Sequence, residues 1–511
     1  MQNNFLLGID IGTYSSKGVI VEALSGNIVV EHSIEHGLDT PKPGWAEHDA
    51  DKVWWSDFVN ICQVLLQKSA IQPNQINCIA VSALGACTLP VDASGKPLRK
   101  AILYGIDTRA SDEIQELEST FSKERIFEIN GMQLSSQSTG PKILWIKNHE
   151  PEVYEKTKFF LTSQAYIVYR LTAQATLDYF TMADFTPMVN IRKISWCEET
   201  TKYITPIDKL PTPTWSCEIA GYVTEEAARE TGLEIGTKVI VGTTDAGAEI
   251  VSSGANKPGD MMMMFGSSFF FVMLTEKLLP SEKFWATPWL DSSAYALQGG
   301  TSTSGSLTRW FRDNFAPMEV SIQNSGGESA YSALAKLLRE SPPGANGLIT
   351  LPYFEGERTP IYDSDAKGMI FGLSLRHSRA DIYRSIIEGI SFGIRHILDS
   401  LLETGAQPKR FIGVAGGTKN REWMQITSNI ANIEIDILAK HGSAPYGDAF
   451  MAGVGAGFYK DLSENSKWVG NMISINPNSS QTEKYHPYYQ IFRELYEGTK
   501  SSMHQLAKLI K

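Results

Sequence analysis

Two short stretches of this sequence place an aspartate beside small residues, as chemistry on a phosphate group would require. Asp10 lies near the end of the apolar stretch FLLGIDIG, and Gly12, Thr13 and Lys17 follow it around a small polar turn. A bound phosphate tail needs backbone donors, a hydroxyl and a carboxylate near its metal ion, and this stretch offers all three. An ordinary Asp-Gly turn is an equally good interpretation of these residues alone, because both types are common in turns.

A second aspartate, Asp245, follows a buried-strand pattern in KVIVGTTDAGAE. A carboxylate at the end of such a strand, with glycines around it, can orient and deprotonate an alcohol that attacks a phosphoryl group. Aspartate is also a common cap at the start of a helix. Taken alone, Asp245 is better explained as a cap.

Two further turns are rich in small residues. The apolar runs MMMMF and FFFVML are separated by Gly266, Ser267 and Ser268, and this pattern predicts a hairpin. Its turn could close on phosphates, although a plain hairpin turn is the simpler explanation. RFIGVAGGTKNREW is typical of a strand, a glycine turn and a helix start, where Gly416 and Gly417 would admit an adenosine and Asn420 could hydrogen-bond to it. A single pair of glycines is weak evidence.

Charged residues also follow the apolar stretch in ILYGIDTRA. Asp107 can accept from two neighbouring sugar hydroxyls and Arg109 donates in a fixed fork, so both are candidates for sugar binding. A surface ion pair or a helix start explains them equally well. His32 and His36 alternate along a predicted strand and share a face, but no third ligand is evident, so a metal site is not expected there.

The elements that must position these residues are repeated in the two halves of the chain. FLLGIDIG, KGVIVEA and NIVVEHSIEH predict three strands in succession, and the middle of the chain has a comparable hairpin. ADIYRSIIEGISFGIRHILDSLL has apolar residues three to four apart and predicts an amphipathic helix packed on a sheet. Turn formers collect in SSGANKPGD, so we expect domains at 1–254 and 255–511, which suits a chain of 511 residues.

Composition excludes several classes of protein. With 42% hydrophobic and 20% charged residues the chain is an ordinary globular protein. A formal net charge of -11 argues against a surface for nucleic acid or anionic membrane. The 5 cysteines form no CxxC pair, which argues against a disulfide framework or zinc site and favours a cytoplasmic location. The longest apolar run, Met261 to Leu274, is interrupted by small polar residues and is too short to span a membrane.

Taken together and in this order, these residues resemble the FGGY family of carbohydrate kinases, and in particular its xylulokinase-like members. The resemblance runs through nearly the whole chain, and its most specific segment extends from Gly356 to Ile394, beginning GERTPIYDSDAKG. PGWAEHDADKVWW and TGPKILW are similar to further family segments. The resemblance implies an α/β fold of two ribonuclease-H-like domains of the actin, sugar kinase and heat-shock ATPase superfamily, with ATP between them and the sugar mainly on the N-terminal domain.

The family pattern also implies roles. Asp10 would hold Mg²⁺ through water and Asp245 would be the catalytic base. The implied nucleotide-binding residues are Gly12, Thr13 and Lys17 in a first phosphate loop, Gly266, Ser267 and Ser268 in a second, and Gly305, Gly416, Gly417 and Asn420. Arg384 and Glu388, four residues apart on the predicted helix of the signature segment, are interpreted as a surface pair.

The sequence departs from its relatives where the substrate is chosen. Leu84-Gly85 stands where xylulokinases commonly have Met-His and glycerol kinases Arg-Glu, whereas ILYGIDTRA resembles the segment in which xylulokinase-like members place a sugar-binding aspartate. We therefore predict ATP- and Mg²⁺-dependent phosphorylation of a small sugar bound near Leu84, Gly85, Asp107, Arg109 and Asp245. A ketopentose such as xylulose is the first candidate; ribulose, gluconate, glycerol and erythritol are alternatives. A homodimer is one candidate assembly.

A rival from another class is a chaperone-like or filament-forming ATPase of the same superfamily. It would share the phosphate loops but would need neither the base Asp245, nor Asp107, nor the GERTP segment. The dependence of ATP turnover on added sugar separates the two. A dinucleotide oxidoreductase is disfavoured, because no GxGxxG follows the first predicted strand.

Overall fold

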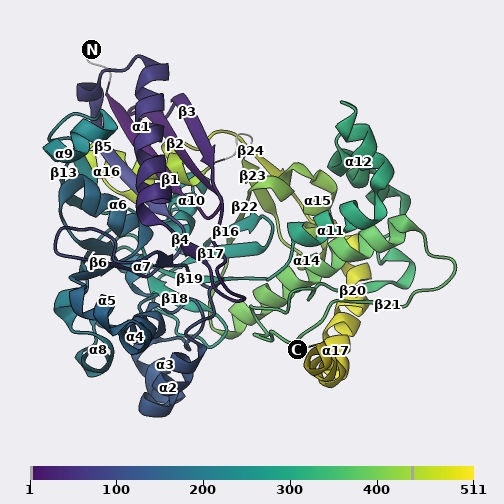
Figure 1. The fold of residues 1–511 in the computed structure, drawn as a ribbon. Coiled ribbons are helices and arrows are strands. Elements are labelled where there is room, and N and C mark those ends of the chain that lie inside the picture. Colours follow the sequence, from purple (N-terminus) through teal and green to yellow (C-terminus); the bar gives the residue numbers. More distant parts are fainter. Residues whose placement is uncertain (1–3, 439–441, 511) are drawn as a thin grey trace. The chain divides into compact units, whose positions relative to one another are not determined.

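The computed structural model describes residues 4–438 and 442–510 (Figure 1). The chain divides into two compact units, each built from more than one stretch. The first consists of Met1–Pro258, Leu274–Ala296 and Gly442–Val469, and the second of Gly259–Met273, Leu297–His441 and Gly470–Lys511. The boundary between Pro258 and Gly259 falls within SSGANKPGD. Residues 274–296 and 442–469 belong with the first unit, although they fall within the predicted second domain.

The first unit is built on a sheet whose strands run in the order β13-β14-β5-β1-β2-β3. The predicted meander is confirmed as β1 (Phe5–Ile11), β2 (Ser15–Glu22) and β3 (Ile28–Glu35), which are antiparallel neighbours. On the other side of β1 lies the parallel strand β5 (Ile76–Ala83), followed by β14 (Lys238–Ile240) and β13 (Ile219–Tyr222). The short strand β15 (Thr243–Thr244) also pairs with β5.

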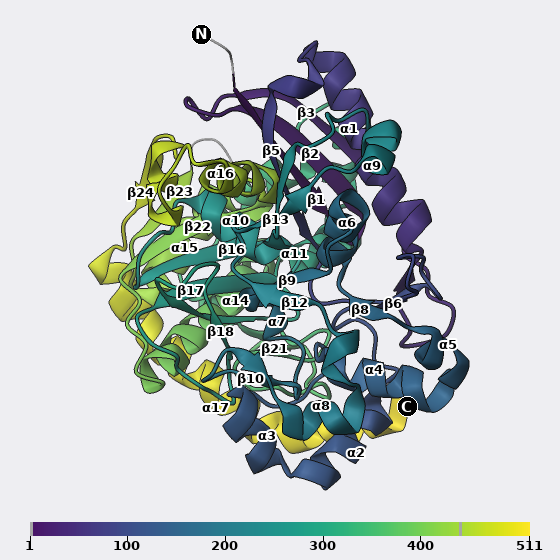
Figure 2. The ribbon, with the colours of Figure 1, turned by 90° about the vertical axis from the view of Figure 1, so that its left-hand side faces the viewer.

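The alternation of residues along β1 decides which helix covers which face of this sheet. Phe5, Leu7, Ile9 and Ile11 belong to one buried core with apolar residues of α1 (Ser56–Ser69) and α6 (Ser163–Thr172). Gly8 lies on the opposite face, where a Cβ would come within 2.0 Å of the Pro445 carbonyl oxygen of α16 (Ala444–Ala456). Asp10 points to the same face as Gly8, because side chains two apart share a face. There α16 lies beside α10 (Asp245–Ser253), as Figure 2 shows.

The first unit has a second apolar core, which includes Leu117, Ile143, Phe160 and Phe185. The remaining helices of this unit are α2 (Ser111–Phe121), α3 (Lys123–Asn130), α4 (Thr139–His149), α5 (Pro151–Lys156), α7 (Tyr179–Met182), α8 (Glu198–Ile204) and α9 (Glu225–Thr231), of which α9 packs against α1 and the first core. Its short strands are β4 (Glu47–His48), β6 (Leu89–Val91), β7 (Ala101–Ile102), β8 (Phe159–Leu161), β9 (Thr176–Asp178), β10 (Val189–Asn190), β11 (Ser195–Trp196) and β12 (Thr212–Thr214).

The second unit repeats the same central pattern. β16 (Asp260–Phe265) and β17 (Phe269–Thr275) form the predicted hairpin, and β22 (Arg410–Val414) lies parallel to β16 on its other side. The sheet continues through β23 (Ile435–Leu438) to β24 (Met472–Ile475). On the other side β19 (Tyr295–Gly300) lies next to β17, and β18 (Trp285–Pro288) is the edge strand beside β19. A hairpin with a parallel strand beside its first member therefore occurs in both units, in agreement with the predicted duplication.

The second unit also contains several helices, of which α14 (Arg379–Glu403) is the most extensively buried. The others are α11 (Gly305–Phe315), α12 (Pro317–Asn324), α13 (Ala330–Leu337), α15 (Arg421–Ala431) and α17 (Ser479–Ile510), and a small sheet pairs β20 (Ile349–Leu351) with β21 (Met369–Phe371). A search of the described part of the chain finds no helix that could cross a membrane.

The predicted helix over 380–402 is confirmed by α14, but the interpretation of Arg384 and Glu388 as a surface pair is wrong. Both side chains are buried, with Arg384 Nε 2.7 Å from Glu388 Oε1. Glu388 also accepts from the Tyr485 hydroxyl at 2.8 Å and the Gly344 backbone N–H at 3.0 Å. The helix is buried on nearly every turn, so even its charged pair points into the protein.

Candidate functional site

Four acidic side chains meet in the first unit, and we call them the carboxylate cluster: Asp10, Asp245, Glu249 and Asp448. Ser82 of β5 joins two of them, because its hydroxyl lies 3.2 Å from Asp10 Oδ1 and 2.7 Å from Asp448 Oδ2. Asp245 is the first residue of α10, and Glu249 lies one turn further along the same helix. Three distant stretches of chain, in β1, α10 and α16, therefore contribute to the cluster.

The helix start at Asp245 separates the two interpretations that the sequence leaves open. Thr244, and not Asp245, is the N-cap of α10, and its hydroxyl oxygen is 3.5 Å from the Gly247 backbone nitrogen. The Asp245 carboxylate accepts from the Ala246 backbone N–H at 2.8 Å. Asp245 is therefore not needed as the cap, and its side chain is held at the positive end of the helix, where a negative charge is favoured.

The carboxylate cluster would bring four negative charges together in a buried place if every group were ionised, and the pKa values of its groups are raised accordingly. Burial, with the neighbouring Asp245 charge as the second cause, raises the pKa of Asp10 to about 8. Burial likewise raises the pKa of Asp245 to about 6 and that of Glu249 to about 8. Burial raises the pKa of Asp448 well above its usual value.

The same cluster presents unsatisfied acceptors to any cation that enters it. Glu249 Oε2 and Asp448 Oδ1 are buried without a hydrogen-bond partner, which is costly unless a ligand supplies a donor or a positive charge. In the described part of the chain no three His, Cys, Asp or Glu residues are arranged to hold a metal ion directly. A divalent cation that keeps several of its waters, as Mg²⁺ does, fits such a site.

The turn that follows Asp10 is tight and leaves its polar groups near the cluster. The Gly12 backbone N–H donates to the Ser15 carbonyl oxygen at 3.0 Å, and a Cβ at Gly12 would lie 2.7 Å from that oxygen. Lys17 is exposed and lies opposite Asp10 across the hairpin. The Thr13 and Tyr104 hydroxyls are hydrogen-bonded at 2.9 Å. The structure thus brings Asp10, Gly12, Thr13 and Lys17 to one end of the β1–β2 hairpin.

Leu84 and Gly85 lie immediately after β5, and the structure gives them different environments. Leu84 is 2% exposed and its backbone N–H donates to the Ile11 carbonyl oxygen at 2.8 Å. Gly85 is partly exposed, and a Cβ there would lie 3.7 Å from Cβ of Tyr104. Tyr104, which the sequence analysis did not single out, therefore stands beside both Gly85 and the first turn.

Asp107 and Arg109 form a buried ion pair, and neither side chain reaches the surface. Arg109 donates to Asp107 through Nε at 3.0 Å and through Nη2 at 2.7 Å, and to Glu47 through Nη1 at 2.8 Å. Asp107 also accepts from the backbone N–H of Ala46 at 2.7 Å and of Arg109 at 3.1 Å. The guanidinium lies 3.9 Å from the ring centroid of Trp45. Both Asp107 oxygens are thus engaged by protein donors.

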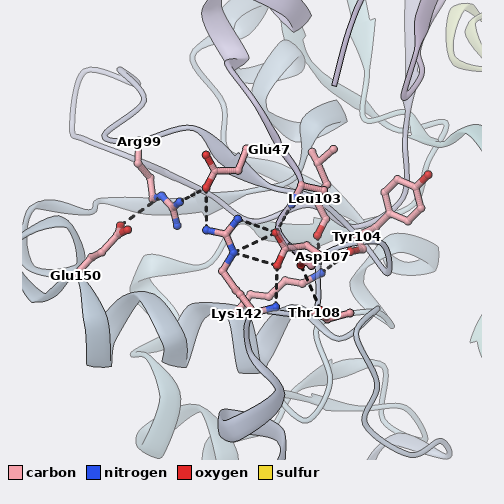
Figure 3. Close-up of polar contacts among 11 residues, drawn as sticks. Glu47, Arg99, Leu103, Tyr104, Asp107, Thr108, Lys142 and Glu150 are labelled. Atoms are coloured by element: carbon pink, nitrogen blue, oxygen red, sulfur yellow. Dashed lines mark hydrogen bonds and ion pairs between the residues drawn. The ribbon is translucent and has the colours of Figure 1, made fainter. Parts of the chain in front are cut away.

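Neighbouring charges extend this pair into a network (Figure 3). Arg99 donates to the same Glu47 oxygen at 2.6 Å and lies 3.3 Å from Glu150. Lys142, which is 1% exposed, donates to the carbonyl oxygens of Leu103 at 2.6 Å and Tyr104 at 3.0 Å. A cavity of about 80 Å³ adjoins Asp107 and Lys142, well below the usual size of a ligand pocket. The network therefore fixes the backbone on either side of Tyr104.

The second unit gathers its own predicted residues at the end of β16. Gly266 N–H donates to the Ser268 carbonyl oxygen at 3.0 Å, which closes the turn of Gly266, Ser267 and Ser268. Gly305, at the start of α11, donates its N–H to the Gly266 carbonyl oxygen at 3.0 Å, and a Cβ there would lie 2.5 Å from that oxygen. The Ser306 N–H donates to the Ser267 carbonyl oxygen at 2.9 Å. The helix start thus braces the serine turn.

The glycine pair lies beside the same turn. Gly416 begins a short 3-10 turn after β22 and has nothing within 4 Å of the position of a Cβ, whereas Gly417 packs against Phe265, where a Cβ would approach within 2.7 Å. Asn420 is the N-cap of α15 and accepts from the Trp423 N–H at 3.1 Å. Gly416 is therefore the open position, and the positive end of α15 faces the same region.

Comparisons with known proteins agree with this arrangement. The model of the FGGY family of carbohydrate kinases matches twice, its N-terminal domain at residues 5–251 and its C-terminal domain at residues 261–456. Xylulose kinase of Bacillus subtilis (strain 168) is 27% identical over 97% of both chains, and gluconokinase of the same organism is 25% identical over 99% of this chain and 98% of its own. The crystal structure of xylulose kinase from Rhodospirillum rubrum superposes with a TM-score of 0.88 at 27% identity, covering 98% of this chain and 100% of that chain. The predicted α/β fold with two ribonuclease-H-like domains is thereby confirmed.

Proposed function

The chain belongs to the FGGY family of carbohydrate kinases, and on that premise we propose that it phosphorylates a ketopentose such as xylulose, with Asp245 as the general base. The observation that carries this proposal is the carboxylate cluster, in which Asp245 stands at a helix start beside the first glycine turn. ATP is the phosphoryl donor used in this family, and the two turns of small residues suit its phosphates.

Asp245 has the environment that a general base for an alcohol requires. Its pKa of about 6, raised by burial, leaves it ionised at neutral pH but more basic than an exposed carboxylate. In the proposed reaction the sugar hydroxyl gives its proton to Asp245 while its oxygen bonds to the γ-phosphorus. The bond from that phosphorus to the β,γ-bridging oxygen breaks, and ADP leaves.

Mg²⁺ fits the carboxylate cluster, and when bound it would supply neutralising charge at the phosphates. Asp10 would hold it through water, since the cluster lacks a direct three-ligand arrangement among the described residues. Glu249 and Asp448 supply the buried, unpartnered oxygens that such waters need. Gly12, Thr13 and Lys17 would contact phosphates from the first unit. Gly266, Ser267 and Ser268 would do so from the second, with Gly305, Gly416, Gly417 and Asn420 near the nucleoside.

The buried ion pair bears on which sugar is accepted. A carboxylated sugar such as gluconate would need a cation, and Arg109 already directs its guanidinium at Asp107 and Glu47. This favours a neutral ketose over an aldonate. We further propose that Asp107 and Arg109 influence sugar binding indirectly, because they hold in place the segment that carries Tyr104. Leu84 and Gly85 would belong to the same sugar site, since Gly85 lies next to Tyr104. The 27% identical relative from Bacillus subtilis is a xylulose kinase, which supports the choice of sugar.

The test is a screen of ADP release with ketopentoses, hexuloses, polyols and aldonates. We expect xylulose to give the largest kcat/KM, with ribulose, glycerol, erythritol and gluconate below it. Asp245→Asn should keep ATP affinity and lose roughly 10²- to 10⁴-fold in kcat, the usual contribution of a general base. Asp208→Asn, at an exposed aspartate, is the matched control.

Two outcomes would contradict the proposal. If Asp245→Asn retained more than about a tenth of the wild-type rate, Asp245 would not be the base, because a general base contributes far more than that. If gluconate or glycerol outperformed every ketopentose, the sugar class would be wrong, and ATP turnover independent of any added sugar would favour a chaperone-like or filament-forming ATPase.

A further inference from the structure

We propose that His36, oriented by Asp57, is a positioning residue that aims the first glycine turn, Gly12 to Ser15, at the phosphates of the nucleotide. The inference rests on the proposed role of this turn in binding phosphate. His36 follows directly after β3, and neither the base nor the metal site of the proposed reaction uses it.

Both ring nitrogens of His36 face acceptors. Nδ1 lies 2.8 Å from Asp57 Oδ2, and Nε2 lies 3.1 Å from the carbonyl oxygen of Gly12. A carboxylate and a carbonyl oxygen can only accept, so both hydrogen bonds form together when each ring nitrogen carries a proton. The His36 side chain is 8% exposed, and the ring is therefore held in one orientation by its two partners.

The backbone of His36 holds the same turn a second time. Its N–H donates to the Tyr14 carbonyl oxygen at 2.9 Å, while the Ser15 carbonyl oxygen accepts from the Gly12 N–H at 3.0 Å. Three carbonyl oxygens of the turn are thus tied to protein donors, two of them by His36. Carbonyl oxygens repel phosphate and N–H groups attract it. The Gly12 N–H is engaged within the turn, so anchoring the carbonyls leaves the N–H groups of Thr13 and Tyr14 to face an anion.

Asp57 makes this arrangement rigid from the side of α1. Its Oδ2 accepts from the Ser16 hydroxyl at 2.7 Å as well as from His36, so one carboxylate holds both the ring and the strand that leaves the turn. The ring of His48 packs edge-on against His36 at 5.3 Å between centroids, and its Nδ1 accepts from Trp54 Nε1 at 3.0 Å. The ring of His36 is therefore confined on the side of β4 as well.

Two isosteric substitutions separate the two hydrogen bonds of the ring. In His36→Asn the amide nitrogen can replace Nδ1 and reach Asp57, but nothing replaces Nε2 at Gly12. In His36→Gln the amide nitrogen can replace Nε2 and keep the bond to Gly12. His32 lies four residues earlier, on β3, with no such bond to the turn, so His32→Asn is the matched control.

The measurements are ADP binding by calorimetry without sugar, the KM values for ATP and sugar, kcat, and thermal unfolding. We expect His36→Asn to weaken ADP binding and raise the KM for ATP roughly 5- to 30-fold, the effect of one buried hydrogen bond. The sugar KM should stay unchanged. His36→Gln should remain within about threefold of wild type on the same reasoning, and His32→Asn should bind ADP like wild type.

Two results would overturn the inference. The first is that His36→Asn binds ADP as tightly as the wild type. The second is that His36→Asn and His36→Gln lose ADP affinity equally, unfold at a lower temperature and have a changed sugar KM. That second result would indicate a structural role only. Failure of the proposed function is visible separately. Suppose that the wild type phosphorylates no sugar, but that His36→Asn still binds ADP more weakly than His36→Gln and the wild type. The positioning role of His36 would then be supported, and the proposed sugar substrate would be wrong.

Discussion

The buried pair of Asp107 and Arg109 allows a prediction whose size follows from the contacts. In Asp107→Ala the guanidinium of Arg109 loses its bonds through Nε and Nη2 and keeps only Glu47, at 2.8 Å. That Glu47 oxygen already accepts from Arg99 at 2.6 Å, so two cations would share one carboxylate. The backbone N–H groups of Ala46 and Arg109 lose their acceptor at the same time.

The expected cost is large because none of these groups can reach water. Breaking a buried ion pair by removing one partner costs about 3–5 kcal/mol in the free energy of unfolding. Asp107→Asn keeps an oxygen for one backbone N–H and should cost about 1–3 kcal/mol, the range for one unsatisfied buried group. Asp107→Ala combined with Arg109→Met should recover part of the loss, because it removes the stranded charge and leaves an apolar chain against Trp45.

The assay is urea unfolding followed by tryptophan fluorescence, read as the shift of the first transition because a chain with two units need not unfold in one step. Sugar KM is measured on every variant that folds. If Asp107→Ala changes stability by less than about 1 kcal/mol, well below the cost of a broken buried pair, and raises the sugar KM tenfold or more, the carboxylate contacts the sugar directly. The positioning role would then be refuted.

Other groups give shorter predictions. Asp245 must be ionised to accept a proton, so kcat should fall as pH drops below its pKa of about 6, and a flat profile down to pH 5 would contradict its role as base. Asp10 and Glu249 have folded-state pKa values of about 8, above those of the unfolded chain. The folded state therefore binds more protons than the unfolded state, and stability is lost as pH rises through about 8. Asp10→Asn should therefore raise the unfolding temperature at pH 9 in EDTA and change it little at pH 5. Added Mg²⁺ should reduce the difference in unfolding temperature between the variant and the wild type. Equal shifts of the unfolding temperature at both pH values would contradict this prediction. Glu388→Ala strands the buried Arg384 and should cost about 3–5 kcal/mol, whereas a cost below about 0.5 kcal/mol would mean that the pair behaves as a surface pair.

Local patterns were sufficient to find the hairpins and the first two carboxylates. Asp10 and Asp245 each follow or end an apolar run beside glycine, and that pattern depends only on neighbouring residues. Glu249 carried a usable signal as well, since it falls one turn after Asp245 on the helix that the same stretch predicts. Asp448 carried none, because the Ser82 hydroxyl that binds it is 366 positions away.

Burial was the property that local patterns could not supply. Arg384 and Glu388 have the same four-residue spacing whether a helix face is exposed or covered, and only the packing of α14 shows that the pair is buried. Asp107 and Arg109 were open to three interpretations because Ala46 and Glu47, which complete their contacts, lie about 60 positions earlier. His36 could be placed on a strand face, but its partner Asp57 comes from a different element.

The return of α16 to the first unit has a consequence for how the chain is made. The face of β1 that carries Gly8 and Asp10 is covered by α16, and the backbones touch so closely that a Cβ at Gly8 would lie 2.0 Å from Pro445. The ribosome must add roughly 200 residues after Pro258 before α16 exists, which takes about 10–40 s at ordinary rates of synthesis. Until then only segments already synthesised, such as α10, can cover that face of the nascent first unit. A fragment that ends at Pro258 would lack α16 permanently, so we expect the first unit to complete its fold only after the ribosome has made α16.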